Sequence, residues 1–407
     1  MKILMLQISR ACAAIDILDN YINGIPIEKA LKEWFKNNRF AGSNDRRSIR
    51  DIIFDILRKR LILFYPFQIN NYSENGRILV LSYLYIYKRD TFSLCDIVDN
   101  KYFLPPIKNK ELLILNKIND YIKKAPKNIL LGYPEFLEKK LKTTLGNDFD
   151  KVMKIFLERA PIYLRINNLK TNLKDEKSNL EKENIICEYC SASKSALRIK
   201  SGEQFLKKSS SYQLGNVELQ DLSSQLTTMV DEISPGKRIL DLCAGSGGKS
   251  LAIASKLKNN ADIFAHDVNT LKLSNLLLRS NRSGARIKII DSRSLNKYEN
   301  FFDIIFIDAP CSGTGTWRRD PKTKWEINDQ KIKTLSKNQY KIMKNSCSYL
   351  KKSGFLIYVV CSLLEDEGEL VVKKFLMNNQ KFSLVNKQLY HPINASDGFF
   401  FAILKKR

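Results

Sequence analysis

The chain has 407 residues, enough for two or three domains, and its 44% apolar and 27% charged residues exclude a wholly disordered protein. Its 68 lysines and arginines outnumber its 43 acidic residues, which gives a formal net charge of +25. So much positive charge on a folded chain predicts a polyanionic partner, with nucleic acid as the first candidate. The alternative is a lysine-rich surface that only meets solvent.

Neither a membrane span nor a metal site is expected. No apolar run approaches the ~20 residues that cross a bilayer, and the apolar start of the chain stops at Leu6, too early for a signal peptide. We therefore expect a cytoplasmic protein whose eight cysteines are reduced thiols. Cys187 and Cys190 form an isolated pair, and the chain has only two histidines, so no zinc site is predicted.

Residues 1–130 are predicted to be helical, because apolar residues recur three and four apart and nothing alternates as in a strand. The clearest pattern runs over 49–61 and follows candidate N-caps at 43–45. Arginines gather on or beside this helix: Arg46, Arg47, Arg50, Arg58 and Arg60. Such a cluster could hold phosphate groups, and a solvated helix face would give the same pattern.

The segment 131–237 reads as a small α+β unit. It begins with a helical pattern, and a charged stretch at 170–182 predicts a further helix. Short apolar runs predict strands at 161–167, 185–190 and 196–199. By itself this segment says little about function.

From residue 238 onward, short apolar runs alternate with helical patterns. The predicted strands are 239–243, 263–267, 287–291, 302–308, 355–361 and 399–404. This alternation is typical of an α/β fold, a parallel sheet with helices on both faces.

Three of these predicted strands end in an acidic residue. Asp267, Asp291 and Asp308 stand where strand ends line the ligand crevice of a doubly wound sheet. A carboxylate after the second strand suits a ribose diol, since each oxygen can accept one hydroxyl. The glycine-rich turn at 245–248 lets the backbone approach a ligand closely, although alone it is a weak signal.

Two cysteines join these acids at the same predicted edge. Cys311 lies in the loop Asp308–Gly315, and Cys361 ends the fifth strand. Methylation of carbon 5 of a pyrimidine needs a thiolate that adds to carbon 6, and a carboxylic acid such as Asp308 can assist at the ring nitrogen. The residues alone do not fix which cysteine attacks; the Pro-Cys loop favours Cys311, and Cys361 could also be a buried cysteine that only packs.

Further stretches carry a resemblance that spans the chain: 45–53, 133–137, 164–167, 219–225, Arg318-Arg319, Trp325, 361–364 and 397–400. Together with Asp308–Gly315, the most specific stretch, they resemble the bacterial RNA 5-methylcytidine methyltransferases, and within these the Sun or Fmu (RsmB/NOP) family.

The resemblance implies three domains. Residues 1–130 would be a NusB-like all-α RNA-binding domain, 131–237 a small α+β linking domain, and 238–407 a Rossmann-like class I methyltransferase domain. The implied cofactor is S-adenosyl-L-methionine and the implied partner is small-subunit (16S) ribosomal RNA, bound by a monomer without metal or membrane. The alternatives are the same chemistry on transfer RNA or another nucleic acid, and a non-catalytic RNA-binding ribosome assembly factor.

The family pattern also implies residue roles. Cys361 would be the nucleophile and Cys311 would assist release of the product. Asp267 would take the ribose hydroxyls, Asp291 would contact the adenine, and Asp308 would lie near the methionine part and the cytosine. The cofactor loop would be Leu242, Cys243, Ala244, Gly245, Ser246, Gly247, Gly248 and Lys249.

RNA contacts are expected around the site. Trp317 and Trp325 could stack on bases or pack the loop against the sheet, and basic side chains could contact phosphates. The predicted set is Arg46, Arg47, Arg50, Arg165, Trp317, Arg318, Arg319 and Trp325. The chain departs from the family at the glycine loop, where Gly245-Ser246 replaces Ala-Pro, at Val360, where threonine is common, and at 365–368, where Pro-Glu-Glu-Asn is common.

Overall fold

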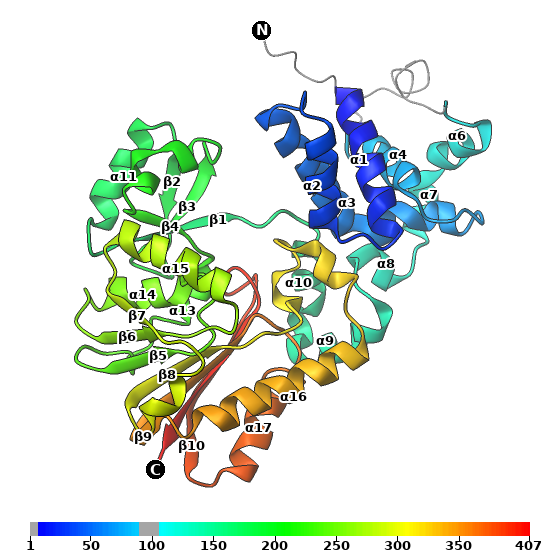
Figure 1. The fold of residues 1–407 in the computed structure, drawn as a ribbon. Coiled ribbons are helices and arrows are strands. Elements are labelled where there is room, and N and C mark those ends of the chain that lie inside the picture. The colour runs from blue at the N-terminus through cyan, green and yellow to red at the C-terminus, as the bar shows by residue number, and fades with distance from the viewer. Residues whose placement is uncertain (1–6, 89–105) are drawn as a thin grey trace. The chain divides into compact units, whose positions relative to one another are not determined.

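The computed structural model describes residues 7–88 and 106–407 (Figure 1). The chain folds into two compact units, and each draws on more than one stretch of the sequence. The helical unit comprises Met1–Lys142, Phe149–Arg159 and Trp317–Glu326. The α/β unit comprises Thr143–Asp148, Ala160–Thr316 and Ile327–Arg407.

The described residues of the helical unit contain helices and no strand, which confirms the helical prediction for this part of the chain. Asp45 accepts from the Gly42 amide at the start of the long third helix, and Asn75 caps the fourth by accepting from Ile78 N. The helices are α1 (Gln7–Ile22), α2 (Ile27–Asn37), α3 (Ser43–Gln68), α4 (Gly76–Tyr87), α6 (Asn109–Asn116), α7 (Ile118–Lys123), α8 (Lys127–Leu131), α9 (Glu138–Leu145) and α10 (Phe149–Ile155). Apolar faces of α1 to α4 form its main core.

A four-stranded antiparallel sheet begins the α/β unit, with strand order β2-β3-β1-β4. Its elements are β1 (Ile162–Ile166), α11 (Leu173–Lys182), β2 (Ile186–Tyr189), β3 (Ala196–Ser201), α12 (Ser210–Gln213), β4 (Val217–Leu219) and α13 (Leu222–Leu226). The three strands and the helix predicted in this segment are confirmed to within a few residues; β4 is too short to stand out in the sequence.

A seven-stranded sheet forms the rest of this unit, in the order β10-β11-β9-β8-β5-β6-β7. Its elements are β5 (Arg238–Asp241), α14 (Gly248–Lys256), β6 (Asp262–Ala265), α15 (Thr270–Ser283), β7 (Ile287–Ile289), β8 (Phe302–Asp308), α16 (Asp329–Ser346), β9 (Leu350–Val360), α17 (Glu369–Asn378), β10 (Phe382–Tyr390) and β11 (Phe399–Lys406). The strands from β5 to β9 run parallel, whereas β11 pairs antiparallel with both β9 and β10. The predicted parallel sheet is confirmed for β5 to β9, and β10 and β11 add an antiparallel hairpin at one edge.

Helices cover both faces of this sheet. Side chains of α14 pack into one apolar cluster with alternate residues of β8, such as Ile304 and Phe306. Residues of α16 and α17 pack into the other cluster with Ile305 and Ile307 (Figure 1). This alternation is what a strand buried on both faces requires.

Candidate active site

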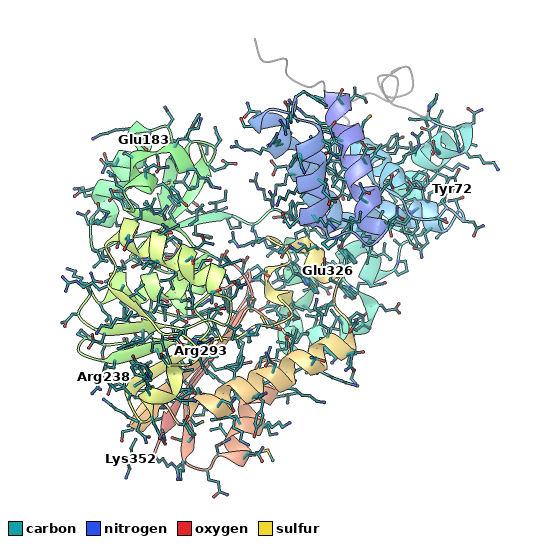
Figure 2. The ribbon with its side chains drawn as sticks, viewed as in Figure 1. Tyr72, Glu183, Arg238, Arg293, Glu326 and Lys352 are labelled. Carbon is teal, nitrogen blue, oxygen red and sulfur yellow. The ribbon has the colours of Figure 1, made fainter. Side chains whose placement is uncertain are left out.

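A cavity of about 930 Å³ opens at the carboxyl ends of β5, β6, β8 and β9. Arg238, labelled in Figure 2, marks the amino-terminal end of β5 and so the opposite edge of the sheet. Because the chain leaves β5 toward β6 on one side and later returns to β8 on the other, the crevice lies at the switch point of the sheet. The glycine loop, Asp267, Asp308, Cys311 and Cys361 all line this cavity.

The glycine loop turns sharply after β5. Gly245 and Gly247 have φ angles of 54° and 84°, which favour glycine, and a Cβ on Gly247 would lie 2.6 Å from Leu276 Cγ. The Gly245 amide donates to Asp267 Oδ2 over 2.8 Å, and Asn269 N donates to Oδ1 over 2.8 Å. Each oxygen of Asp267 keeps a lone pair for a further donor, so this carboxylate can still accept the hydroxyls of a ribose.

Lys249 joins the loop to the end of β8. Its ammonium lies 2.6 Å from Asp308 Oδ2, and the lysine side chain is 9% exposed. Burial disfavours the charged lysine, but the charge and hydrogen bond of Asp308 outweigh it, so the pKa of Lys249 lies above its ordinary value. Cys361 also interacts electrostatically with this ammonium. The pair fixes a cation and a carboxylate beside the cavity.

The two predicted thiols lie together, with their sulfurs 3.3 Å apart. Backbone contacts hold the loops that carry them: Gly315 N donates to Cys361 O over 3.1 Å, and Gly398 N donates to Gly315 O over 2.7 Å. A Cβ on Gly315 would lie 1.9 Å from Gly398 O, so only glycine permits this approach. The hydrogen bond with Cys361, burial, and the charges of Cys361 and Glu367 raise the pKa of the Cys311 thiol.

Several residues around the site were not singled out from the sequence. Gln220 and Ser224 line the cavity although they precede the seven-stranded sheet in the chain. Asp241, at the end of β5, also lines it, and its Oδ2 accepts from Ser250 Oγ over 2.6 Å. Glu367 lies buried behind the two cysteine loops. An acid inside a buried strand was a usable signal for Asp241; for Glu367, only its place shortly after Cys361 pointed to it.

Asp291 lies outside the cavity-lining set. It is exposed and follows β7, and its carboxylate accepts from the amides of Arg293 and Ser294 and from Ser294 Oγ. These hydrogen bonds lower the pKa of Asp291. Its role as an adenine contact stays a prediction.

Three of the residues predicted to contact RNA are buried in the structure. Trp317 is fully buried and packs edge-on against Phe156 at 5.7 Å, so it presents no ring face to a base. Arg318 is buried in the same unit and donates to Arg159 O over 3.3 Å. Arg165 is 2% exposed in β1, because its guanidinium packs inward and donates to Gln220 Oε1 over 2.7 Å.

Trp325 also serves the packing of the helical unit. Its Nε1 donates to Leu57 O over 2.8 Å, and its ring packs against the core of α1 to α4. Nearby Lys324 is buried and donates to Arg58 O and Gly132 O, and burial together with the charge of Arg58 lowers its pKa to about 7. The loop packs against helices rather than against the sheet. Arg319 stays a predicted contact.

Arg46, Arg47 and Arg50 lie on α3. Arg46 donates to the carbonyl oxygens of Ala41 and Phe35, and Arg50 pairs with Glu28 over 2.9 Å. Contacts of these three arginines with RNA stay a prediction.

Residues 7–88 and 106–407 contain no group of three or more His, Cys, Asp or Glu side chains placed to hold a metal ion. Among the helices of these residues, none has both the length and the apolarity that a bilayer crossing requires.

The sheet order, with its cavity at the strand ends, defines a Rossmann-like methyltransferase fold. Residues 228–405 match the family model described as 16S rRNA methyltransferase RsmB/F, and residues 133–205 match its RsmF/B-like ferredoxin-like domain. The chain belongs to the RsmB/F family of methyltransferases, which confirms the resemblance found in its motifs.

Individual relatives agree. The ribosomal RNA small subunit methyltransferase B of Photorhabdus laumondii is 31% identical over 287 residues, which cover 68% of this chain and 66% of that protein. The match thus spans slightly less than two thirds of the relative's length. The crystal structure of PH0851 has a TM-score of 0.77 at 22% identity, covering 99% of this chain and 100% of that one. NSun6 from Pyrococcus horikoshii with SFG has a TM-score of 0.59 at 20% identity, covering 68% and 99%.

We predict that Asp241→Asn stabilises the cofactor-free protein increasingly as pH rises from about 4 to about 7. Burial raises the pKa of Asp241 from 3.8 to about 7, so the folded protein keeps a proton that the unfolded chain releases in this range. Wild-type stability at this site is therefore full below about pH 4 and falls as pH rises to about 7. The Tm difference between variant and wild type should grow over this window. The corresponding change in the free energy of unfolding is about 3 kcal/mol.

Asp303→Asn is the control. Burial at Asp303 is outweighed by hydrogen bonds from Lys351 and from the Arg238 amide, which hold its pKa below the ordinary 3.8. Its Tm difference from wild type should stay flat between about pH 5 and pH 7. A flat difference for Asp241→Asn as well would contradict the prediction.

Proposed function

We propose that the protein methylates carbon 5 of a cytidine in small-subunit ribosomal RNA, using S-adenosyl-L-methionine. The observation that carries this proposal is the pair of sulfurs 3.3 Å apart, in one cavity with the Lys249–Asp308 pair. A dehydrogenase or a simple binding domain has no need of two thiols at this place. The names of the family and of its relatives support the ribosomal substrate.

The cavity fits the cofactor. Its volume suits a nucleoside with an amino-acid tail, the glycine loop leaves the backbone open to that tail, and Asp267 can accept the ribose hydroxyls. Asp308 lines the same cavity, and we expect it to contact both the tail and the target base. When bound, S-adenosyl-L-methionine supplies an electrophilic methyl group.

Three residues are expected to act on the target cytosine. The Cys361 thiolate forms a bond to carbon 6, which makes carbon 5 an electron-rich enamine carbon. Asp308, as the carboxylic acid after it takes the proton from the Lys249 ammonium, donates a hydrogen bond to the ring nitrogen and so stabilises the negative charge that develops there. After methylation, a base takes the proton from carbon 5, the electrons of that bond re-form the double bond to carbon 6, and the bond from carbon 6 to sulfur breaks, so that Cys361 leaves as a thiolate. We expect Cys311 to assist this release.

The test is to incubate the protein with labelled S-adenosyl-L-methionine and unmodified 16S ribosomal RNA, transfer RNA or DNA, and to identify the labelled nucleoside by mass spectrometry. Label in 5-methylcytidine from ribosomal RNA is expected. Label only in another nucleic acid would overturn the substrate. Bound cofactor with no label in naked RNA or in assembling small subunits would favour an assembly factor without catalysis.

Cys361→Ala should lower the rate of methyl transfer by about three orders of magnitude or more, because it removes the sulfur atom that activates the ring. Cofactor affinity, measured by calorimetry, should be retained, since the glycine loop and Asp267 are untouched. Activity near the wild-type level would contradict the assignment of the nucleophile.

Cys311→Ala should instead trap the enzyme on its product. Because Cys311 is expected to assist release, a covalent protein–RNA adduct should accumulate and migrate slowly on a denaturing gel. Normal turnover without an adduct would reject this role, and Cys361→Ala, which cannot form the bond, serves as the control.

A groove of about 640 Å³ on the helical unit is the best-supported site for RNA outside the cavity. It lies between α2 and α3 and is lined by Glu28, Leu31, Lys32, Phe35, Lys36, Arg39, Arg46 and Arg50. None of the described residues pairs with the side chains of Lys32, Lys36 or Arg39, so these cations are available for phosphates. We propose that residues 1–130 are a NusB-like RNA-binding domain, 131–237 a linking domain and 238–407 the catalytic domain, in a monomer that acts in the cytoplasm.

The double variant Lys32→Glu/Lys36→Glu should weaken binding of a 16S fragment about tenfold or more and should flatten the salt dependence of the affinity. Fluorescence anisotropy over a range of salt concentrations measures both. The matched control is Lys123→Glu/Lys124→Glu, at exposed positions at the end of α7 in the same unit. Equal losses for the two double variants would show that the groove has no special role.

A further inference from the structure

Glu367 is a fully buried carboxylate that joins the two cysteine loops. Its Oε1 accepts from Ser312 N over 2.8 Å, and its Oε2 accepts from the hydroxyls of Ser312 and Ser362, the latter over 2.6 Å. Ser312 directly follows Cys311, and Ser362 directly follows Cys361. One side chain thus holds the residue next to each thiol.

Further contacts fix Glu367 itself. Gln339 on α16 donates to Oε1 over 3.2 Å, and the Tyr358 hydroxyl donates to the Glu367 carbonyl oxygen over 2.5 Å. Thr314 also links the two cysteine loops, since its hydroxyl lies 3.0 Å from Ser362 Oγ and accepts from Leu363 N. The described residues give Glu367 hydrogen-bond donors but no cation. The charge of Glu367 is one of the causes that raise the pKa of the Cys311 thiol.

The charges around the two sulfurs are unequal. The charges of Cys361 and Glu367 both raise the pKa of Cys311, and a backbone hydrogen bond at Gly313 lowers it. Tyr358 also lies near Cys311 and Glu367, and its pKa is raised by burial and by their charges. Cys361 instead interacts with the Lys249 ammonium, which Asp308 holds. A proton shared by two sulfurs 3.3 Å apart is therefore favoured on Cys311.

We propose that Glu367 is a positioning residue that fixes the two cysteine loops and keeps the shared proton on Cys311, so that Cys361 is the thiolate. This deepens the proposed function and rests on it, because it explains why the second cysteine is the nucleophile. The sequence alone could not make that choice. The Cys311 thiol donates its hydrogen to the Cys361 sulfur, and no covalent bond changes in this resting state.

The test uses the full chain without RNA and labels its thiols briefly with iodoacetamide at several pH values. Alkylation requires the thiolate, and mass spectrometry of the peptides gives the rates at Cys311 and Cys361 separately. Wild type should be labelled mainly at Cys361. In Glu367→Gln, which keeps the shape but loses the charge, the ratio of Cys311 to Cys361 labelling should rise about tenfold.

Two variants separate charge from simple structure. Glu369→Gln makes the same change two residues away, at an exposed glutamate that pairs with Lys387, and should leave the ratio as in wild type. Glu367→Asp keeps the charge but shortens the reach, so it should keep the labelling preference while single-turnover methylation slows about tenfold. In both Glu367 variants the cofactor affinity should match that of wild type.

The outcomes are distinct. Equal or reversed labelling in wild type, or an unchanged ratio in a folded Glu367→Gln protein, would overturn the proposal, and so would normal methylation by Glu367→Asp. Because the wild-type ratio is itself decisive, a variant that fails to fold leaves the test intact. Failure of the proposed function would show as absent methylation in wild type, which the thiol labelling does not require.

Discussion

The parallel register of β8 against β9 is the constraint on which the site depends. It pairs Asp308 with Val359, so the loop after β8 and the residue after β9 leave the sheet at the same height. Cys311 and Cys361 are 50 residues apart in the chain and still bring their sulfurs within 3.3 Å. The close contact between Gly315 and Gly398 then fixes the loop that carries Cys311 against the segment before β11.

Much of this site was predictable because its residues sit at strand ends. An apolar run followed by an acid or a cysteine places that side chain at the carboxyl edge of a parallel sheet, whatever the details of packing. Asp267, Asp308, Cys311 and Cys361 follow this rule and line one cavity. Asp291, like Asp267, lies two residues past the end of its strand, but its carboxylate accepts hydrogen bonds from its own loop instead of lining the cavity.

Other features depend on tertiary partners that no local pattern encodes. Arg165 and Trp317 have residue types typical of RNA contacts, yet both are buried by elements distant in sequence. In the sequence Glu367 resembles a surface acid. Its burial could not be predicted, because its four hydrogen-bond donors come from three separate segments of the chain. The hairpin of β10 and β11 was missed because β10 is largely exposed and lacks a continuous apolar run.

The segment Trp317–Glu326 has a consequence for synthesis of the chain. It belongs to the helical unit, where Lys324 and Trp325 donate to backbone carbonyl oxygens of Leu57, Arg58 and Gly132. A ribosome makes these helices long before residue 317 emerges, so until then those carbonyl oxygens lack their donors and the core of α1 to α4 lacks its contact with Trp325. Its last piece arrives only after the loop that carries Cys311. The amino-terminal part of the protein therefore cannot finish folding until about half of the methyltransferase domain has been translated.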